Sequence, residues 1–206
     1  MAVINQVLYN EMPGKAAELR EAGLELNHLV VSAYNAINEM KAHWRGTRYN
    51  ELGVAFNEMR PLFNSILGLV VGTFPTTVEQ VANNYAVVDT GARICEVKEE
   101  PIQPFTDIEP TDPNEFRFIQ EEVEQARLIV NQNFDYMLDQ MNIIDAIITQ
   151  IPWESDAATT FRETFIQLRD QIIAKIDDIK FRFDSSMNQT IAEVQRGEDA
   201  NQGLNS

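Results

Sequence analysis

The sequence predicts an all-α protein: a four-helix bundle made of two antiparallel helix-turn-helix hairpins, an intrachain pseudo-dimer, with a long crossover linker. Three observations predict this fold. Apolar residues recur at steps of three and four over long stretches, which is the period of an amphipathic helix. The same apolar stripe occurs twice, about half of the 206-residue chain apart. A proline-rich, acidic stretch, residues 91–112, separates the two copies.

The repeated stripe keeps its register over both hairpins. Seven apolar positions downstream of the first turn recur with an offset of 109 residues, and five upstream positions recur with an offset of 108. The one-residue difference falls near Pro152, in the second turn, so the sequence predicts an internal duplication. The downstream stripe is Leu52, Phe56, Met59, Phe63, Leu67, Val70 and Phe74, matched by Phe161, Phe165, Leu168, Ile172, Ile176, Ile179 and Phe183; the upstream stripe is Leu26, Leu29, Ala33, Ala36 and Met40, matched by Phe134, Met137, Met141, Ile144 and Ile148.

Residues 1–90 are expected to form the first hairpin. Pro13 fits the first turn of a helix, where its missing N–H costs little, and this helix runs to about residue 42 or 43. The sequence Trp44-Arg45-Gly46 predicts the turn, because glycine allows the dihedral angles of a tight reversal. The second helix begins near Thr47 and ends between residues 89 and 91.

Pro75 is expected to interrupt that second helix. Proline lacks a backbone donor and clashes with the preceding turn, which predicts a kink or break at residues 72–75. Thr76 and Glu79 then have the spacing of a capping box, so the helix is expected to begin again there.

Residues 91–112 are expected to be an extended linker, and residues 113–206 to form the second hairpin. Asp112-Pro113-Asn114-Glu115 predicts a helix start, with Asp112 as the cap and Pro113 at the first position. This third helix runs to about residue 150, and Pro152–Ser155 forms the second turn. The fourth helix runs from residue 156 to about 196, and the polar tail, 197–206, is expected to fray.

The length of the linker predicts how the hairpins pack. Neighbouring helices in an up-down bundle need only about two to eight connecting residues. The linker can span roughly 70 Å when extended, whereas a helix of 30 residues is about 45 Å long. It can therefore return along the whole bundle and place the two turns at opposite ends. The alternative is a flexible tether between independent hairpins, which would leave the apolar stripes exposed.

Charge restricts the partners. The chain has 16 basic and 32 acidic residues, a net charge of −16, which argues against a nucleic-acid partner and against anionic membranes. No stretch is expected to be apolar enough to span a membrane. Residues 1–6 lack the basic region of a signal peptide. The protein is therefore expected to be made in the cytoplasm and either to stay there or to leave without an N-terminal signal.

The turn and the end of the first hairpin resemble the WXG family of small type VII secretion proteins. That family has Trp-x-Gly in the turn of a helical hairpin, as in Trp44-Arg45-Gly46, and Tyr-x-x-x-Asp/Glu near the end of the second helix, as in Tyr85 and Asp89. The resemblance implies a bundle of antiparallel hairpins, and a Tyr85–Asp89 signal read by the export machinery and its ATPase. This chain resembles two such partners fused into one.

The second copy departs from the family pattern. Ser155 stands where the family has the glycine after Trp153, and Val194 stands at the place of the tyrosine, with Glu198 as the acid. The resemblance therefore leaves open whether the second half is read by the export machinery.

Each candidate site residue also has a purely structural interpretation. Tyr85 falls on a seam position, so it can pack the end of the bundle while Asp89 is solvated. Trp44 and Trp153 can fill the bundle where the chain reverses, or Trp44 and Gly46 can form a groove that contacts a secretion ATPase.

Little in the sequence points to catalysis. Glu25 and His28 have the Glu-x-x-His spacing of di-iron bundles, but such sites need the motif on two helices, and His43 lies on the same predicted helix. Cys95 lies in the linker without an adjacent histidine, and no glycine-rich phosphate loop is present. We therefore expect no enzyme, no cofactor and no metal, with a metal-dependent bundle enzyme as the remote alternative.

The leading hypothesis is a non-enzymatic substrate or escort of a type VII secretion system, secreted or held at the cell surface, that acts through protein–protein interaction. Its expected partners are the secretion ATPase, a secreted effector or another helical hairpin. The alternative is a helical scaffold or assembly protein that is not exported.

Overall fold

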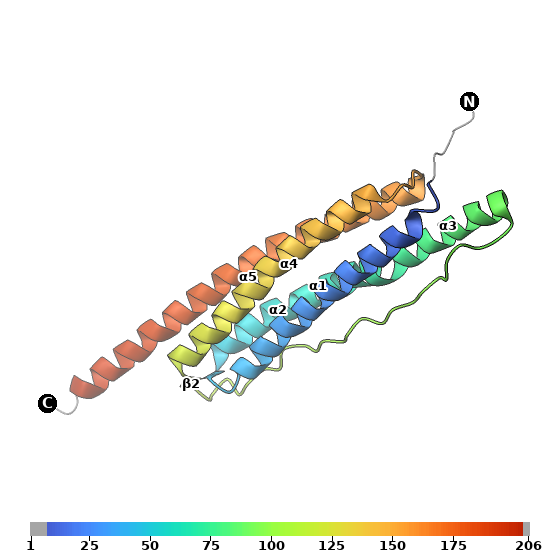
Figure 1. Ribbon diagram of the computed structural model, residues 1–206. Coiled ribbons are helices and arrows are strands. Elements are labelled where there is room, and N and C mark those ends of the chain that lie inside the picture. The colour runs from blue at the N-terminus through green and yellow to red at the C-terminus, as the bar shows by residue number, and fades with distance from the viewer. Residues whose placement is uncertain (1–7, 204–206) are drawn as a thin grey trace. The chain divides into compact units, whose positions relative to one another are not determined.

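The computed structural model describes residues 8–203, and this part of the chain is all-α apart from one two-stranded pairing (Figure 1). The expectations for the first seven residues, including the missing signal peptide, and for the last three residues of the tail lie outside the described residues. The elements are α1 (Met12–Met40), β1 (Trp44–Arg45), α2 (Thr47–Leu67), the π-helix η1 (Gly68–Thr73), α3 (Phe74–Thr90), β2 (Arg117–Phe118), α4 (Gln120–Gln150) and α5 (Asp156–Gly203).

The chain divides into two compact units, and each unit takes segments from both predicted hairpins and from the linker. Unit 1 comprises Met1–Val31, Pro61–Pro104 and Asp135–Ile173, and unit 2 comprises Ser32–Arg60, Phe105–Phe134 and Ala174–Ser206.

In unit 1, aromatic side chains of the two predicted hairpins pack against each other. The rings of Phe74 and Phe161 stack with their centroids 4.7 Å apart, and Trp153 lies 6.5 Å from Phe74. Gln140 of α4 donates a hydrogen bond to the carbonyl of Ala22 in α1.

Unit 2 repeats this pattern with other residues. Phe56 of α2 stacks on Phe134 of α4 at 5.7 Å between centroids. The amide of Asn133 donates to the Ser32 hydroxyl at 3.1 Å. Apolar burial of this kind is the dominant stabilising contribution in helical proteins.

Burial confirms the two predicted stripes as core positions. All seven residues of the first downstream stripe are buried, and in the second copy only Phe161 and Leu168 remain half-buried. The upstream stripes are buried as well, apart from the half-buried Ala36. The period of three and four therefore identified the packed helix faces correctly.

Of the kink or break predicted at residues 72–75, the break is wrong: the helix is continuous, with a π-helical segment before Pro75. Pro75 cannot donate to the carbonyl of Val71, four residues earlier. The π-helical segment η1 accommodates this, and the Phe74 N–H bonds the carbonyl of Leu69, five residues back. α3 ends as predicted, on Gly91 with a φ of 77°.

The predicted capping box at Thr76 and Glu79 is wrong, because no new helix begins there. Thr76 donates its hydroxyl proton to the carbonyl of Lys98 in the linker. Glu79 forms a buried ion pair with Arg20 instead. Local spacing matched a helix start, but the carboxylate is needed by a tertiary contact.

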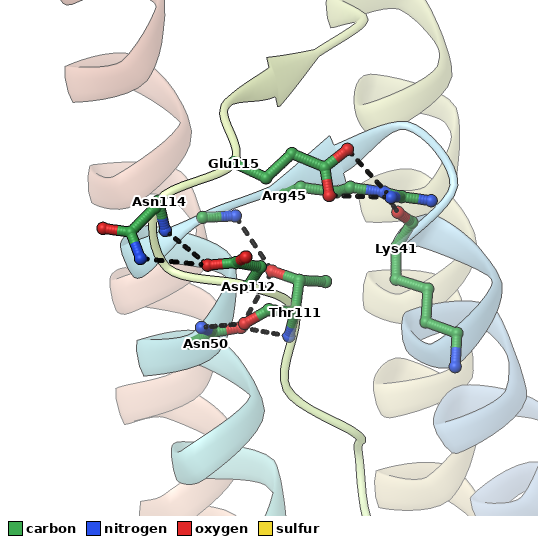
Figure 2. Close-up of polar contacts among 8 residues, drawn as sticks. Lys41, Arg45, Asn50, Thr111, Asp112, Asn114 and Glu115 are labelled. Carbon is green, nitrogen blue, oxygen red and sulfur yellow. Dashed lines mark hydrogen bonds and ion pairs between the residues drawn. The ribbon is translucent and has the colours of Figure 1, made fainter.

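The predicted helix start at Asp112 is also wrong. Asp112 closes a turn: its carboxylate accepts the Asn114 N–H at 2.9 Å and its carbonyl accepts the Glu115 N–H at 3.1 Å (Figure 2). The chain then pairs β2 antiparallel with β1, Trp44 opposite Phe118, and α4 begins only at Gln120. Strand pairing therefore overrides the local helix signal.

α5 extends further than predicted. The helix passes through Gly197 and continues to Gly203, so the expected fraying from residue 197 is wrong for residues 197–203. One internal glycine costs about 1 kcal/mol of helix propensity, which is too little to end a helix of 48 residues.

One helical stretch, Thr47–Thr90, is long and apolar enough to cross a membrane by length and composition, with a mean hydropathy of 1.3 in its most apolar window. The expectation that no stretch reaches this level is therefore wrong. Half of that window is buried inside the structure, and buried core helices pass the same test, so it is weak evidence for a span.

Candidate functional site

The first turn places Trp44 inside unit 2. Its side chain is only 1% exposed and contacts Phe118 edge-to-face at 5.8 Å and Phe183 in a stacked arrangement at 6.1 Å. These two partners come from β2 and α5, so the indole joins three segments that are far apart in sequence. Trp44 is therefore a core residue of this unit.

Gly46 makes the reversal possible. Its φ of +113° is a conformation that L side chains rarely adopt, and a Cβ there would lie 3.0 Å from the Glu115 carbonyl. The Gly46 N–H donates to the Thr111 hydroxyl at 2.9 Å. Arg45 donates to both carboxylate oxygens of Glu115 at 2.9 Å, which holds the linker against the turn (Figure 2).

An open pocket of about 340 Å³ lies beside this turn. Trp44 and Gly46 line it together with the exposed Phe116. The two arginines that line it are paired within unit 2, Arg45 with Glu115 and Arg48 with Glu193, and the Arg48 hydrogen bond lowers the pKa of the Glu193 carboxyl below its usual range.

The second turn, in unit 1, reverses the chain without a glycine. Trp153 is 5% exposed and packs near Phe74 and Phe161. Ser155 caps α5, its hydroxyl accepting the Ala158 N–H at 3.1 Å. Among residues 8–203 only Gly46 and Gly91 have positive φ, so the serine at this turn costs no backbone strain.

Tyr85 and Asp89 lie one turn apart in the last part of α3, in unit 1. Tyr85 is 37% exposed, and the buried residues nearest to it in α3 are Ala82, Asn83 and Ala86. Asp89 accepts a short hydrogen bond from the Tyr9 hydroxyl, and this bond raises the pKa of Tyr9 above its usual value. The tyrosine is therefore accessible, whereas the carboxylate already has one partner.

The structure does not bring all the predicted site residues into one unit. Unit 2 contains Trp44 and Gly46, and unit 1 contains Tyr85, Asp89, Trp153 and Ser155.

The linker is bound to the helices by side-chain amides, which sequence analysis did not find. In unit 1, Asn27 pairs with both the N–H and the carbonyl of Gln103, and Asn83 accepts from Ile94 and Cys95 and donates to the Cys95 carbonyl. Over these residues the linker is thus not a free tether.

A buried ion pair adds a charged contact to the linker in unit 1. Arg20 and Glu79 form two parallel hydrogen bonds at 3.0 Å, with side chains 6% and 5% exposed. Glu79 also accepts the Lys98 N–H at 2.9 Å, and Arg20 donates to the Lys98 carbonyl at 3.1 Å. The ion pair therefore forms hydrogen bonds with both the N–H and the carbonyl of Lys98.

In the part of the chain that the structure describes, the residues with potential chemistry that the sequence analysis singled out are not gathered into one group. Glu25 and His28 are both exposed, so the motif does not point into a helix interface as a bundle metal site requires. Within residues 8–203 no three His, Cys, Asp or Glu side chains are grouped so that they could hold a metal ion. Burial, and then the charge of Glu79, raises the pKa of the Cys95 thiol, which disfavours the nucleophilic thiolate.

No protein-family model matches this sequence, and neither a curated protein nor a solved structure shows detectable similarity to it.

Proposed function

We propose that this chain is a fused pair of WXG-like helical hairpins that form one four-helix bundle. The resemblance in the turn and at the end of α3 suggests this assignment, and contacts inside each unit support the bundle. Phe56 of the first hairpin stacks on Phe134 of the second in unit 2, and Phe74 stacks on Phe161 in unit 1. A chain that satisfies its own apolar seams needs no partner hairpin to fold.

On this proposal the protein is a non-enzymatic substrate or escort of a type VII secretion system. It folds in the cytoplasm, is recognised by the secretion ATPase and is exported without a cleaved N-terminal signal. The observation that carries the proposal is the exposed Tyr85 beside two fully buried alanines, Ala82 and Ala86. An aromatic ring with a polar tip and a carboxylate one turn away offer a receptor an apolar anchor and a charge.

The pocket beside the first turn is the second contact that this proposal uses. Trp44 and Gly46 line it, but Trp44 is almost fully buried, so its contribution is to shape the pocket. The exposed Phe116 is the apolar group there that a partner can reach.

Secretion of the Tyr85→Ala variant tests the proposal in a cell that has the secretion machinery. We expect the variant to remain in the cells, and the unchanged protein to reach the culture supernatant only when the secretion ATPase is present. Phe181→Ala is the matched control, because it removes another exposed aromatic ring, 73% exposed, from α5. Undiminished secretion of folded Tyr85→Ala contradicts the signal.

A helical scaffold that is not exported remains the second candidate. In unit 1, Tyr136 and Ile143 of α4 are each 50% exposed and lie seven residues apart, on one face of the helix. Such a face suits association with another helical protein. Stable association together with purely cytoplasmic protein would favour this candidate.

A further inference from the structure

One face of unit 2, formed by α1 and α2, holds residues 105–111 of the linker, here called the strap. Phe105 and Ile108 are 5% and 3% exposed, the residues between them and after them are exposed, and Thr111 is half-buried. One residue in three therefore faces the helices. This is the period of a polyproline II helix, which the neighbouring Pro104 and Pro110 favour.

Side-chain amides on this face form hydrogen bonds with the backbone of the strap. Asn57 donates to the Ile108 carbonyl at 3.1 Å and accepts the Ile108 N–H at 2.7 Å. Asn50 likewise donates to the Thr111 carbonyl at 2.9 Å and accepts the Thr111 N–H at 2.8 Å. Except for proline, every residue offers these two backbone groups, so the contact does not depend on the side chain that is bound.

The spacing of the amides fits the same conformation. Asn50 and Asn57 are seven residues apart on one helix, a rise of about 10.5 Å. Ile108 and Thr111 are three residues apart, which spans about 9.3 Å in a polyproline II helix. The helix thus presents its amides at nearly the repeat of an extended chain.

Two apolar contacts and two cations add selectivity for side chains. Gly53 leaves room for Ile108, because a Cβ at this glycine would lie 2.9 Å from the Ile108 Cγ2. The ring of Phe105 lies 4.9 Å from the ring of Tyr34. The two acidic residues of the strap each meet a cation: Arg60 contacts Asp107 at 2.9 Å, and Lys41 contacts Glu109 at 2.5 Å.

The amides are not a remnant of the internal repeat. With the offsets of 108 and 109 residues, the counterparts in the second half carry no amide. The first half of the chain therefore differs from the second at the positions that contact the strap. This difference indicates that the asparagines serve to bind an extended chain. The counterparts of Asn50 and Asn57 are Thr159 and Ile166.

We propose that this face of α1 and α2 is a binding site for an extended acidic peptide in the polyproline II conformation, and that a segment of this kind from a partner protein docks there by displacing the strap. Backbone hydrogen bonds can be transferred from one peptide to another. The strap buries only two apolar side chains, Phe105 and Ile108, so local opening is expected to cost far less than global unfolding. The inference does not rest on secretion.

The test uses a fluorescently labelled peptide with the sequence of residues 102–112, which ends one residue beyond the strap. In the unchanged full-length chain the tethered strap competes at high effective concentration, so the peptide binds weakly. In the full-length double variant Phe105→Ala and Ile108→Ala, we expect binding at least about tenfold tighter. Adding Asn57→Ala removes two hydrogen bonds and is expected to weaken this binding about tenfold.

Peptide variants separate backbone recognition from general stickiness. N-methylation at Ile108 removes the proton that Asn57 accepts and is expected to abolish binding. N-methylation at Asp107, whose amide is not a donor to these asparagines, is the matched control and is expected to preserve it. Replacing Asp107 and Glu109 of the peptide by lysine should weaken binding, more strongly at low salt.

Three results overturn the proposal. The first is a folded Phe105→Ala, Ile108→Ala variant that binds the peptide no better than the unchanged chain. The second is a peptide N-methylated at Ile108 that binds as well as its parent. The third is concentration-dependent self-association of the variant without peptide binding, which would assign the site to a second copy. If the double variant does not fold, Asp107→Arg with Glu109→Lys releases the strap through exposed side chains and takes its place.

Discussion

Breaking the buried ion pair of unit 1 is expected to destabilise the protein strongly. In Glu79→Ala, the Arg20 guanidinium stays only 6% exposed and loses both carboxylate bonds, while its Nε already has no hydrogen-bond partner. Removing one partner of such a pair typically costs 3–5 kcal/mol, because an uncompensated charge stays buried, so we expect about 3–5 kcal/mol here. In a chain of this size, that loss corresponds to a fall in Tm of roughly 6–20 °C.

Urea unfolding followed by circular dichroism measures this loss. Glu58→Ala is the matched control, because Glu58 pairs with Lys175 at 3.0 Å with side chains 57% and 39% exposed. An exposed pair contributes about 0–1 kcal/mol, so the control should lose little. The double variant Arg20→Met, Glu79→Leu should recover most of the loss, since apolar residues of similar volume replace a buried pair at little cost.

A second readout follows the linker. Glu79 accepts the Lys98 N–H, and the Cys95 thiol lies 3.7 Å from the Glu79 carbonyl oxygen. Glu79→Ala is therefore expected to raise the alkylation rate of Cys95. A loss of less than about 1 kcal/mol, or a double variant as unstable as Glu79→Ala, would refute the reasoning.

Substitutions at two further residues test the turns. Trp44→Ala should lower the free energy of unfolding by about 3–5 kcal/mol, because the indole is 1% exposed; urea unfolding that shows a loss below about 1 kcal/mol would rule out its core role. Ser155→Ala removes the cap of α5 and should lower the free energy of unfolding by about 1 kcal/mol, whereas Ser155→Asp should retain stability. Equal urea-unfolding midpoints for the unchanged chain and both variants would show that the cap does not contribute to stability.

Apolar periodicity was sufficient to predict which helix faces are buried. The positions from Leu52 to Phe74 are buried because a stripe at steps of three and four can face only one side of a helix. The reversal at Gly46 was predictable as well, because the positive φ observed there is the conformation in which glycine is favoured.

Local signals failed where tertiary contacts compete with them. Asp112 to Glu115 has the residues of a helix start, yet the Ile119 N–H bonds the His43 carbonyl at 2.9 Å and β2 pairs with β1. Thr76 and Glu79 have capping-box spacing, but Glu79 is taken by Arg20. Nothing in the spacing of these residues along the chain reveals such distant partners.

The asparagines were missed for a different reason. A periodicity analysis scores apolar residues, so polar residues on a helix are assigned to a solvated face. The available signal was a coincidence of two periods: Asn50 and Asn57 seven residues apart on a helix, and apolar residues every third position in the linker, at Ile102, Phe105 and Ile108. Either period alone is common, and only their common rise of about 10 Å connects them.

That coincidence bears on why the two halves of the chain differ. The second half keeps the apolar stripe but has Thr159 and Ile166 where the first has Asn50 and Asn57. A helix that faces only water gains nothing from paired amides, because water satisfies them equally well. A helix that must hold an extended backbone does gain, since each amide satisfies a donor and an acceptor at once. The difference between the halves therefore follows from the linker, which lies on the first hairpin.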